Sequence, residues 1–234
     1  MNILIPMAGA GSRFEKAGYT FPKPLIEVHG KPMIQKVVEN LNLKGRYIFI
    51  VQKEHYERYA LNYLLPLIAP GCEIVQVDEM TEGAACTTLL AKKFIDNDAP
   101  LITANSDQFI EFEDGWQNDL LPSNDGHILT FKATHPKWSF AKVSDGLVSE
   151  VAEKKPISDT ATVGVYHWSK GSDYVKYAEQ MIAKDIRVNN EFYVCPVFNE
   201  AIQDGKSIGT IPVKKMWGLG TPEDLRTFLS DYRG

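Results

Sequence analysis

The chain opens with a short apolar run, "NILIPM" at residues 2–7, that passes directly into the glycine-containing segment "AGAGSRF". A run of this kind predicts a buried β-strand. The two glycines, Gly9 and Gly11, let backbone N–H groups close around an anion, and Arg13 adds positive charge just after them. The segment therefore predicts a strand that ends at a phosphate-binding loop, with a plain strand-to-helix turn as the alternative.

The first hundred residues alternate between apolar runs of strand length and segments with helical periodicity. Further strands are expected at residues 46–51, 72–77 and 100–104. Helices are expected to begin at Pro32, to span 55–65 and to follow Gly83. This alternation is typical of an α/β fold with a doubly wound, mostly parallel, Rossmann-like sheet.

The second half predicts antiparallel strands, at 127–134, at 140–151 with a hairpin turn at Asp145 and Gly146, and at 161–168. Helices near 170–184 and 192–204, a last strand at 208–213 and a helix start in "TPED" at 221–224 follow. No linker-like composition separates the halves. We therefore expect one domain, 1–234, with a nucleotide-binding half at 1–110 and an acceptor-binding half at 111–234.

The composition excludes several classes of protein. The 25 Lys and Arg residues against 30 Asp and Glu residues give a net charge of −5, which disfavours an extended nucleic-acid surface. The three cysteines are widely spaced, as expected for reduced thiols rather than for a disulfide framework or a zinc site. No stretch approaches the ~18 apolar residues needed to cross a bilayer. We expect a cytoplasmic protein with no membrane or nucleic-acid partner.

Two common phosphate loops do not match this sequence. A dinucleotide-binding loop requires a third glycine where the chain has Phe14, and a Walker A loop requires a Gly-Lys-Ser/Thr sequence that neither Gly9 nor Gly11 begins. The remaining pattern is G-x-G-x-R followed about ten residues later by Pro-Lys-Pro at 22–24. The two prolines stiffen the chain around Lys23, so its ammonium group is expected to have a defined position.

Five motifs occur in a fixed order over nearly the whole chain: "MAGAGSRF" (7–14), "PKPLIEVHGKPMI" (22–34), "NSDQ" (105–108), "GLVSEVAEK" (146–154) and "GTPEDL" (220–225). In these motifs the chain resembles the sugar-phosphate nucleotidyltransferase family, also called nucleotide-sugar pyrophosphorylases. In length it is similar to the compact cytidylyltransferases of that family. The resemblance implies an enzyme that transfers a nucleoside monophosphate from an NTP to a phosphorylated small acceptor and releases pyrophosphate.

The resemblance also implies the substrates and their setting. CTP is favoured over UTP or dTTP, and the acceptor is a sugar phosphate or another small phosphorylated metabolite. Such a product would be a precursor for a surface polysaccharide of the capsule or lipopolysaccharide type. A homodimer is compatible with the resemblance.

For the nucleotide, the resemblance assigns residues from the loop and from the third predicted strand. Arg13 would contact the leaving β- and γ-phosphates and Lys23 the α-phosphate, where charge builds up during transfer. The backbone of the loop would line the triphosphate, and a second group would bind the base. The loop residues are Ala8, Gly9, Ala10, Gly11 and Ser12, and the base-binding residues are Gln76, Glu82 and Gly83.

For the metal, Asp107 directly follows a predicted strand, where open α/β sheets place their ligands. One or two carboxylates are enough to hold Mg²⁺ together with substrate phosphates, and the resemblance makes Asp107 a metal ligand. A second metal aspartate of many relatives would fall at Gly218. We take Glu191 as the candidate to replace it.

For the acceptor, the resemblance places Glu153 near a hydroxyl or amine, Lys154 on the phosphate and Gly164 beneath the acceptor. Lys155 directly follows Lys154, so the register of this assignment has two solutions. The acceptor half is also rich in aromatic residues, which are core residues by default. They are Trp138, Tyr166, Trp168, Phe192, Tyr193 and Trp217.

Two other functions remain open at this point. A glycosyltransferase with a related nucleotide-sugar-binding fold would use an Asp-x-Asp metal motif, whereas Asp107 is followed by Gln108 and Phe109. A non-catalytic nucleotide-binding module would account for the glycine at 218. Pyrophosphate release from an NTP would distinguish the predicted enzyme from both.

Overall fold

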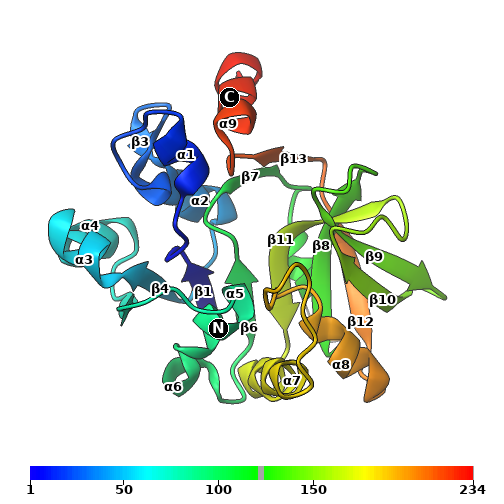
Figure 1. The fold of residues 1–234 in the computed structure, drawn as a ribbon. Helices are drawn as coiled ribbons and strands as arrows, with labels where there is room; N and C mark the ends of the chain where they lie inside the picture. Colours follow the sequence, from blue (N-terminus) through cyan, green and yellow to red (C-terminus); the bar gives the residue numbers. More distant parts are fainter. Residues whose placement is uncertain (121–123, 234) are drawn as a thin grey trace.

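The structure, a computed structural model, describes residues 1–120 and 124–233, so residues 121–123 and 234 of the predicted second half lie outside it. Its first half is a parallel sheet (Figure 1). The strands are β1 (Asn2–Pro6), β4 (Arg46–Gln52), β5 (Glu73–Val77) and β6 (Leu101–Ala104). β1 lies between β4 and β6, and β4 pairs with β5, all in parallel. The predicted parallel half is confirmed.

Helices cover both faces of this sheet. They are α2 (Met33–Leu41), α3 (Lys53–Arg58), α4 (Leu61–Ile68), α5 (Ala84–Leu89) and α6 (Lys92–Ile95). Successive side chains of a strand point to opposite faces, so Ile3 and Ile5 pack in the core cluster that contains residues of α2 and α4. Leu4 packs in the other core cluster, with residues of α5 and α6. This is the doubly wound arrangement that the sequence predicts.

Two helix predictions in this half are wrong in detail. The helix expected over 55–65 is broken, because Ala60 adopts a left-handed backbone conformation (φ 50°) and separates α3 from α4. Pro32 is not the first helical residue: it has an extended conformation, and α2 begins at Met33.

The second half is mainly antiparallel. Its strands are β8 (Gly126–Lys132), β9 (Ser139–Ser144), β10 (Leu147–Glu153), β11 (Thr160–Trp168) and β12 (Ile208–Pro212), with helices α7 (Gly171–Ala183) and α8 (Val197–Gln203). β9 and β10 form the predicted hairpin around Asp145 and Gly146, while β12 pairs with β8 in parallel. The helix predicted for 192–204 begins only at Val197, because Phe192 hydrogen-bonds through its backbone to the loop before α5.

Strand β11 joins the two halves into one sheet. Its last residues pair with β6 and β8, and Ala161 near its start pairs with Phe140 of β9. The register of β11 against β8 shifts between Thr162 and Tyr166, and within this stretch the carbonyl of Gly164 accepts a hydrogen bond from the backbone N–H of Asn105 (2.9 Å). The irregular part of β11 therefore lies directly beside the end of β6, where the halves meet.

Short elements complete the fold around this junction: α1 (Ser12–Lys16), the 3₁₀ helices η1 (Lys23–Leu25) and η2 (Trp116–Leu120), and strands β2 (Glu27–Val28), β3 (Lys31–Pro32), β7 (Gln108–Glu111) and β13 (Lys215–Gly218). β7 and β13 form a separate antiparallel pair, so β12 is not the last strand. The helix start predicted in "TPED" is confirmed: Thr221 caps α9 (Pro222–Asp231) by accepting a hydrogen bond from the Asp224 N–H (3.1 Å). In the described part of the chain, no helix has the length and apolar character to span a membrane.

Candidate functional site

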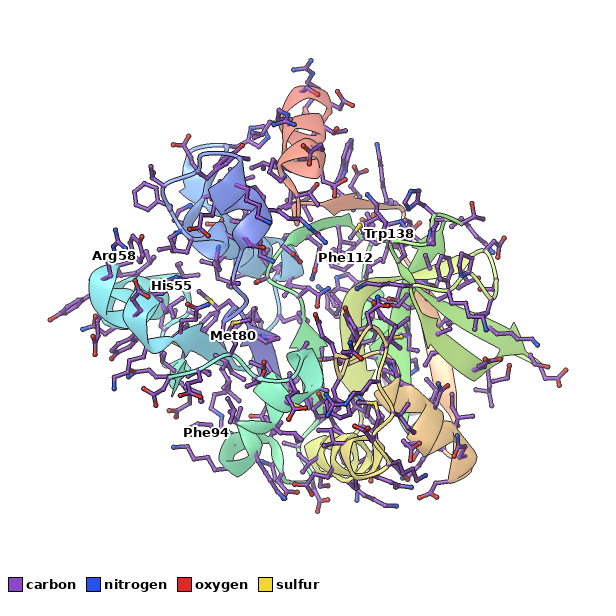
Figure 2. The ribbon with its side chains drawn as sticks, in the orientation of Figure 1. His55, Arg58, Met80, Phe94, Phe112 and Trp138 are labelled. Carbon is purple, nitrogen blue, oxygen red and sulfur yellow. The ribbon has the colours of Figure 1, made fainter. Side chains whose placement is uncertain are left out.

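A cavity of about 700 Å³ lies at the carboxyl ends of β1, β5 and β6 and extends over the antiparallel half. Its lining comes from both halves of the chain, including Met80 on the loop after β5 and Trp138 just before β9, which Figure 2 labels. Open α/β sheets place ligands at the carboxyl ends of their strands. The cavity is therefore the candidate functional site.

The glycine loop forms one wall of the cavity. Ala8 and Gly9 line it, and the Gln52 side-chain amide at the end of β4 donates hydrogen bonds to both of their carbonyl oxygens (2.8 and 3.3 Å). Gly11 adopts a left-handed conformation (φ 64°) at the start of α1, which places Arg13 in the cavity lining. Among residues 1–120 and 124–233, Arg13 has no ion-pair partner. Its guanidinium group is therefore available to an anion.

Lys23 and Asp107 meet in the cavity. The Lys23 Nζ atom lies 2.7 Å from Asp107 Oδ2, and both side chains are about one-fifth exposed. Lys23 begins η1 after an extended Pro22, and Asp107 lies between β6 and β7. A Cβ atom on Gly220 would lie 2.8 Å from Asp107 Oδ2, so a residue with a side chain at 220 would force this carboxylate to move. Two residues that the sequence assigns to different roles, Lys23 to the α-phosphate and Asp107 to the metal, are thus brought into direct contact in the cavity.

Of the three residues predicted to bind the base, Glu82 and Gly83 line the cavity and Gln76 does not. Gln76 is exposed in β5 and is not among the residues that line the described cavity, whereas Glu79, Glu82 and Gly83 are. Gly83 has a φ of 137°, and a Cβ atom there would lie 2.5 Å from the backbone of Phe192. Backbone hydrogen bonds from Phe192 N to Glu82 O and from Ala85 N to Phe192 O fix this contact. Gly83 therefore lies where the loop after β5 contacts the segment before α8.

Glu153 lies at the end of β10 and lines the cavity on the side formed by the second half of the chain. Its carboxylate accepts a hydrogen bond from the Ser139 hydroxyl. Burial raises the pKa of Glu153, and the charge of Glu191 raises it further, against the opposing effects of Ser139 and Lys154. Burial also raises the pKa of Cys195, with the Glu153 charge adding to the shift. Glu153 is thus a partly desolvated carboxylate facing the cavity.

Lys154, which is predicted to bind the acceptor phosphate, contacts Tyr193 in the structure. Its backbone is left-handed (φ 53°), and its ammonium group lies 4.4 Å from the ring centre of Tyr193 and donates a hydrogen bond to the Tyr193 hydroxyl. Within the described residues, Lys154 is not part of the cavity lining. Gly164 lines the cavity as predicted. The role of Lys154 in holding a phosphate stays a prediction.

Sequence reasoning missed Asp224 and Lys137. A Cβ atom on Gly218 would lie 3.4 Å from Asp224 Oδ2, so the carboxylate beside position 218 is that of Asp224. Asp224 forms an ion pair with Lys137 (2.9 Å), and both line the cavity. In the sequence Asp224 has the pattern of an acidic residue in the first turn of a helix, which does not indicate that it lines the cavity. Glu191, the sequence candidate for this place, also lines the cavity, where its charge raises the pKa of Glu153 and of Tyr193.

Some of the aromatic residues of the second half line the cavity, and the others are packed in the core. Trp138, Tyr166 and Tyr193 line the cavity. Trp168 and Phe192 are buried in a core cluster, and Trp217 packs against a third cluster beside α9.

Among residues 1–120 and 124–233 there is no group of three or more His, Cys, Asp or Glu side chains arranged to hold a metal ion.

Comparison with known proteins gives a consistent result. A sequence profile described as nucleotidyl transferase matches residues 3–233. The nucleoside-diphosphate-sugar pyrophosphorylase of Vibrio cholerae RC9 is 30% identical and superimposes with a TM-score of 0.82, over 97% of this chain and 99% of that one. The inositol-1-phosphate CTP transferase of T. maritima, 13% identical, shares the fold with a TM-score of 0.73 over 100% of this chain and 97% of that one.

A curated relative is longer than this chain. The bifunctional protein GlmU of Methanocaldococcus jannaschii is 25% identical over 234 residues, which cover 96% of this chain and 52% of the relative. The chain therefore spans about half the length of the curated relatives it matches.

Proposed function

Because this chain belongs to the nucleotidyl transferase family, we propose that it transfers a nucleoside monophosphate from an NTP to a phosphorylated small acceptor and releases pyrophosphate. The family resemblance inferred from the motifs is confirmed by the profile match. The observation that supports the activity best is the Lys23–Asp107 pair, which faces a cavity whose other wall is the glycine loop. Cationic and carboxylate groups at one point suit the transfer of a charged phosphoryl group.

The reaction needs no general base from the protein. The acceptor phosphate is already ionised at neutral pH and attacks the α-phosphorus, and pyrophosphate leaves. Catalysis then consists of positioning and charge stabilisation. Arg13 would bind the leaving phosphates, since it has no ion-pair partner among the described residues, and the Lys23 ammonium would move from Asp107 to the α-phosphate as charge develops there.

The residues present fit a bound Mg²⁺. Asp107 supplies a hard oxygen ligand, and Gly220 leaves space around it that a side chain would fill. Asp107 would hold the ion, with Asp224 as the nearest carboxylate to position 218. When bound, the metal would neutralise phosphate charge and orient the triphosphate.

CTP is the proposed nucleotide, in preference to UTP or dTTP. Two carboxylates on the loop after β5, Glu79 and Glu82, line the cavity where we propose that the base binds, and Glu82 also pairs with Arg187. A carboxylate accepts a hydrogen bond from the exocyclic amine of cytosine, whereas the corresponding atom of uracil or thymine is an acceptor itself. We also propose that the enzyme works in the cytoplasm and that its product is a precursor of a surface polysaccharide.

The test is a pyrophosphate-release screen of four NTPs against phosphorylated sugars, amines and amino-acid derivatives, with Mg²⁺ present. The proposal expects release that needs both an NTP and an acceptor, fastest with CTP. Binding of NTP without release across the panel would favour a nucleotide-binding module. Transfer of sugar from a nucleotide sugar, with no reaction of NTPs, would favour a glycosyltransferase.

The two adjacent lysines at 154 and 155 should differ in their effect on the acceptor. In the proposed assignment the Lys154 ammonium would move from Tyr193 to the acceptor phosphate and contact it before and during transfer. Loss of this contact in Lys154→Ala should raise acceptor KM about tenfold or more with little change in kcat. Lys155→Ala is the matched control and should behave as wild type. Steady-state kinetics with NTP and acceptor varied separately measure both. A rise in acceptor KM in Lys155→Ala alone would show that Lys155, and not Lys154, binds the acceptor phosphate.

A further inference from the structure

We propose that Arg187 sets the base preference of the site by holding the Glu82 carboxylate in a fixed position. Arg187 belongs to the second half of the chain and is not among the residues that line the described cavity, so it is a positioning residue. The proposal rests on the proposed function, because it concerns how the same site distinguishes cytosine from uracil or thymine. Its basis is a set of direct contacts between the segment before α8 and the loop after β5.

The segment that carries Arg187 continues into a tight hairpin. The backbones of Val188 and Glu191 exchange two hydrogen bonds of 3.0 Å. Between them, Asn189 and Asn190 both have left-handed conformations (φ 49° and 63°), as in a type I′ turn. Asn190 and Glu191 line the cavity. Arg187 therefore lies at the base of a hairpin that forms part of the cavity wall.

Each nitrogen atom of the Arg187 guanidinium group has a partner. Nη2 lies 2.5 Å from Glu82 Oε2, and Nε donates a hydrogen bond to Asp185 Oδ1 (2.5 Å). Nη1 donates a hydrogen bond to the carbonyl oxygen of Asn190 (3.3 Å). The central carbon Cζ lies 4.0 Å from the ring centre of Phe192. Because the planar fork is bound at its nitrogens and on one face, it has a defined position.

The same segment also fixes the backbone of the loop that carries Glu82. The Phe192 N–H donates a hydrogen bond to the Glu82 carbonyl oxygen, and the Ala85 N–H donates one to the Phe192 carbonyl oxygen (both 2.9 Å). Gly83 allows this close approach because it has no side chain. Residues 187–192 thus hold both the backbone and the carboxylate of Glu82.

Glu82 differs in this respect from Glu79, the other carboxylate of the loop that lines the cavity. Among residues 1–120 and 124–233, Glu79 has no ion-pair partner. The Glu82 side chain is 67% exposed, so without Arg187 it would be free to adopt several rotamers. The ion pair therefore makes Glu82 the carboxylate of this loop that has a fixed direction.

A fixed carboxylate can distinguish between pyrimidine bases. An ionised carboxylate accepts hydrogen bonds and cannot donate them. With Oε2 held by Arg187, Oε1 of Glu82 remains to accept a hydrogen bond from the exocyclic amine of cytosine. Uracil and thymine have a carbonyl oxygen in the place of this amine, so the two oxygens would repel each other. A mobile carboxylate would turn away from that oxygen into solvent and would discriminate less between the bases.

The experiment measures the kcat/KM for CTP divided by the kcat/KM for UTP, from pyrophosphate release with an acceptor on which the wild type is active. Arg187→Met keeps an apolar stem over the Phe192 ring but removes the charge and the donors. We expect the ratio to fall about tenfold or more, the scale of one hydrogen bond to a charged group, mainly through a higher KM for CTP. An exposed ion pair contributes little to folding, so the melting curve should stay close to that of the wild type.

A second variant shows whether Arg187 acts through Glu82. The amide nitrogen of a glutamine can donate to the uracil oxygen, so Glu82→Gln should also lower the ratio. Adding Arg187→Met to Glu82→Gln should then cause no further fall. A loss of stability alone would affect both nucleotides alike and would leave the ratio unchanged.

Arg58→Met is the matched control. Arg58 also pairs with a glutamate, Glu54 (3.7 Å), and lies over an aromatic ring, that of Tyr59 (5.5 Å). It is not among the residues that line the described cavity. This variant should keep the wild-type ratio.

Failure of this inference is distinguishable from failure of the proposed function. Pyrophosphate release with no preference for CTP in the wild type, an unchanged ratio in Arg187→Met, or additive effects in the double variant would each overturn the role of Arg187 and leave the transferase activity standing. If no NTP and acceptor give release, the transferase proposal fails. Calorimetric titration of the wild type and of Arg187→Met with CTP and with UTP then decides the role of Arg187: tighter binding of CTP that is lost in the variant supports it, and equal binding of the two nucleotides or the same preference in both proteins rejects it.

Discussion

Replacement of Lys23 by alanine is expected to lower kcat by about 10²–10³-fold, with NTP binding weakened only mildly. The Lys23 ammonium lines the cavity beside Asp107, where we propose that charge develops on the α-phosphate during transfer. An interaction that strengthens in the transition state affects kcat more than ground-state binding. Single-turnover and steady-state rates at saturating NTP and acceptor measure the change.

The matched control for this variant is Lys16→Ala. Lys16 is an exposed cation at the end of α1 and does not line the cavity, so its loss should leave kcat within about twofold of wild type. An unchanged kcat in Lys23→Ala would remove Lys23 from the catalytic role. A rise in the NTP dissociation constant with kcat unchanged would make it a ground-state binding residue instead.

Asp107→Asn is expected to reduce turnover by more than about 10²-fold and to raise the Mg²⁺ concentration needed for half-maximal rate. The amide keeps the shape of the side chain but removes the negative charge, which should weaken metal binding by the protein. Loss of a metal contribution of several kcal/mol corresponds to this change in rate. Activity measured against Mg²⁺ concentration tests both parts of the expectation.

The fold should survive this substitution. The Lys23–Asp107 ion pair is partly exposed and so contributes at most about 1 kcal/mol, which corresponds to a melting temperature within about 4 °C of wild type. Asp114→Asn, a fully exposed carboxylate outside the cavity, is the control and should match wild type in both rate and Mg²⁺ dependence. Wild-type Mg²⁺ dependence in Asp107→Asn would show that the metal is held elsewhere.

The parts of the site that the sequence predicts well are set by local backbone chemistry. The glycines fix the loop after β1, and the prolines on either side of Lys23 fix the start of η1. Asp107 follows a buried strand whose apolar pattern is unambiguous. Each of these residues is placed by its immediate neighbours in the chain, so the pattern and the structure agree.

The parts that sequence reasoning places less well depend on contacts between distant segments. Lys154 contacts Tyr193 and is not among the residues that line the described cavity. Its backbone adopts a left-handed conformation at a strand end, which no pattern in the sequence indicates. Asp224 reaches the cavity only because α9 starts beside the β7–β13 pair, and that pairing joins residues about a hundred positions apart. The late start of α8 has the same cause, since Phe192 is bonded to the loop at Gly83.

Strand β11 has a consequence for how the protein unfolds. It pairs with β6 on the parallel side and with β8 and β9 on the antiparallel side, so it is the strand that links β8 and β12 to β9 and β10 and links all four to the parallel sheet. We therefore expect the two halves to unfold as one cooperative unit with a single melting transition. A ligand at either end of the cavity stabilises the whole unit, by about 2.7 kcal/mol at a hundred times its dissociation constant. The melting temperature of this chain should therefore rise when either the nucleotide or the acceptor binds in the cavity, so one measurement reports the binding of both.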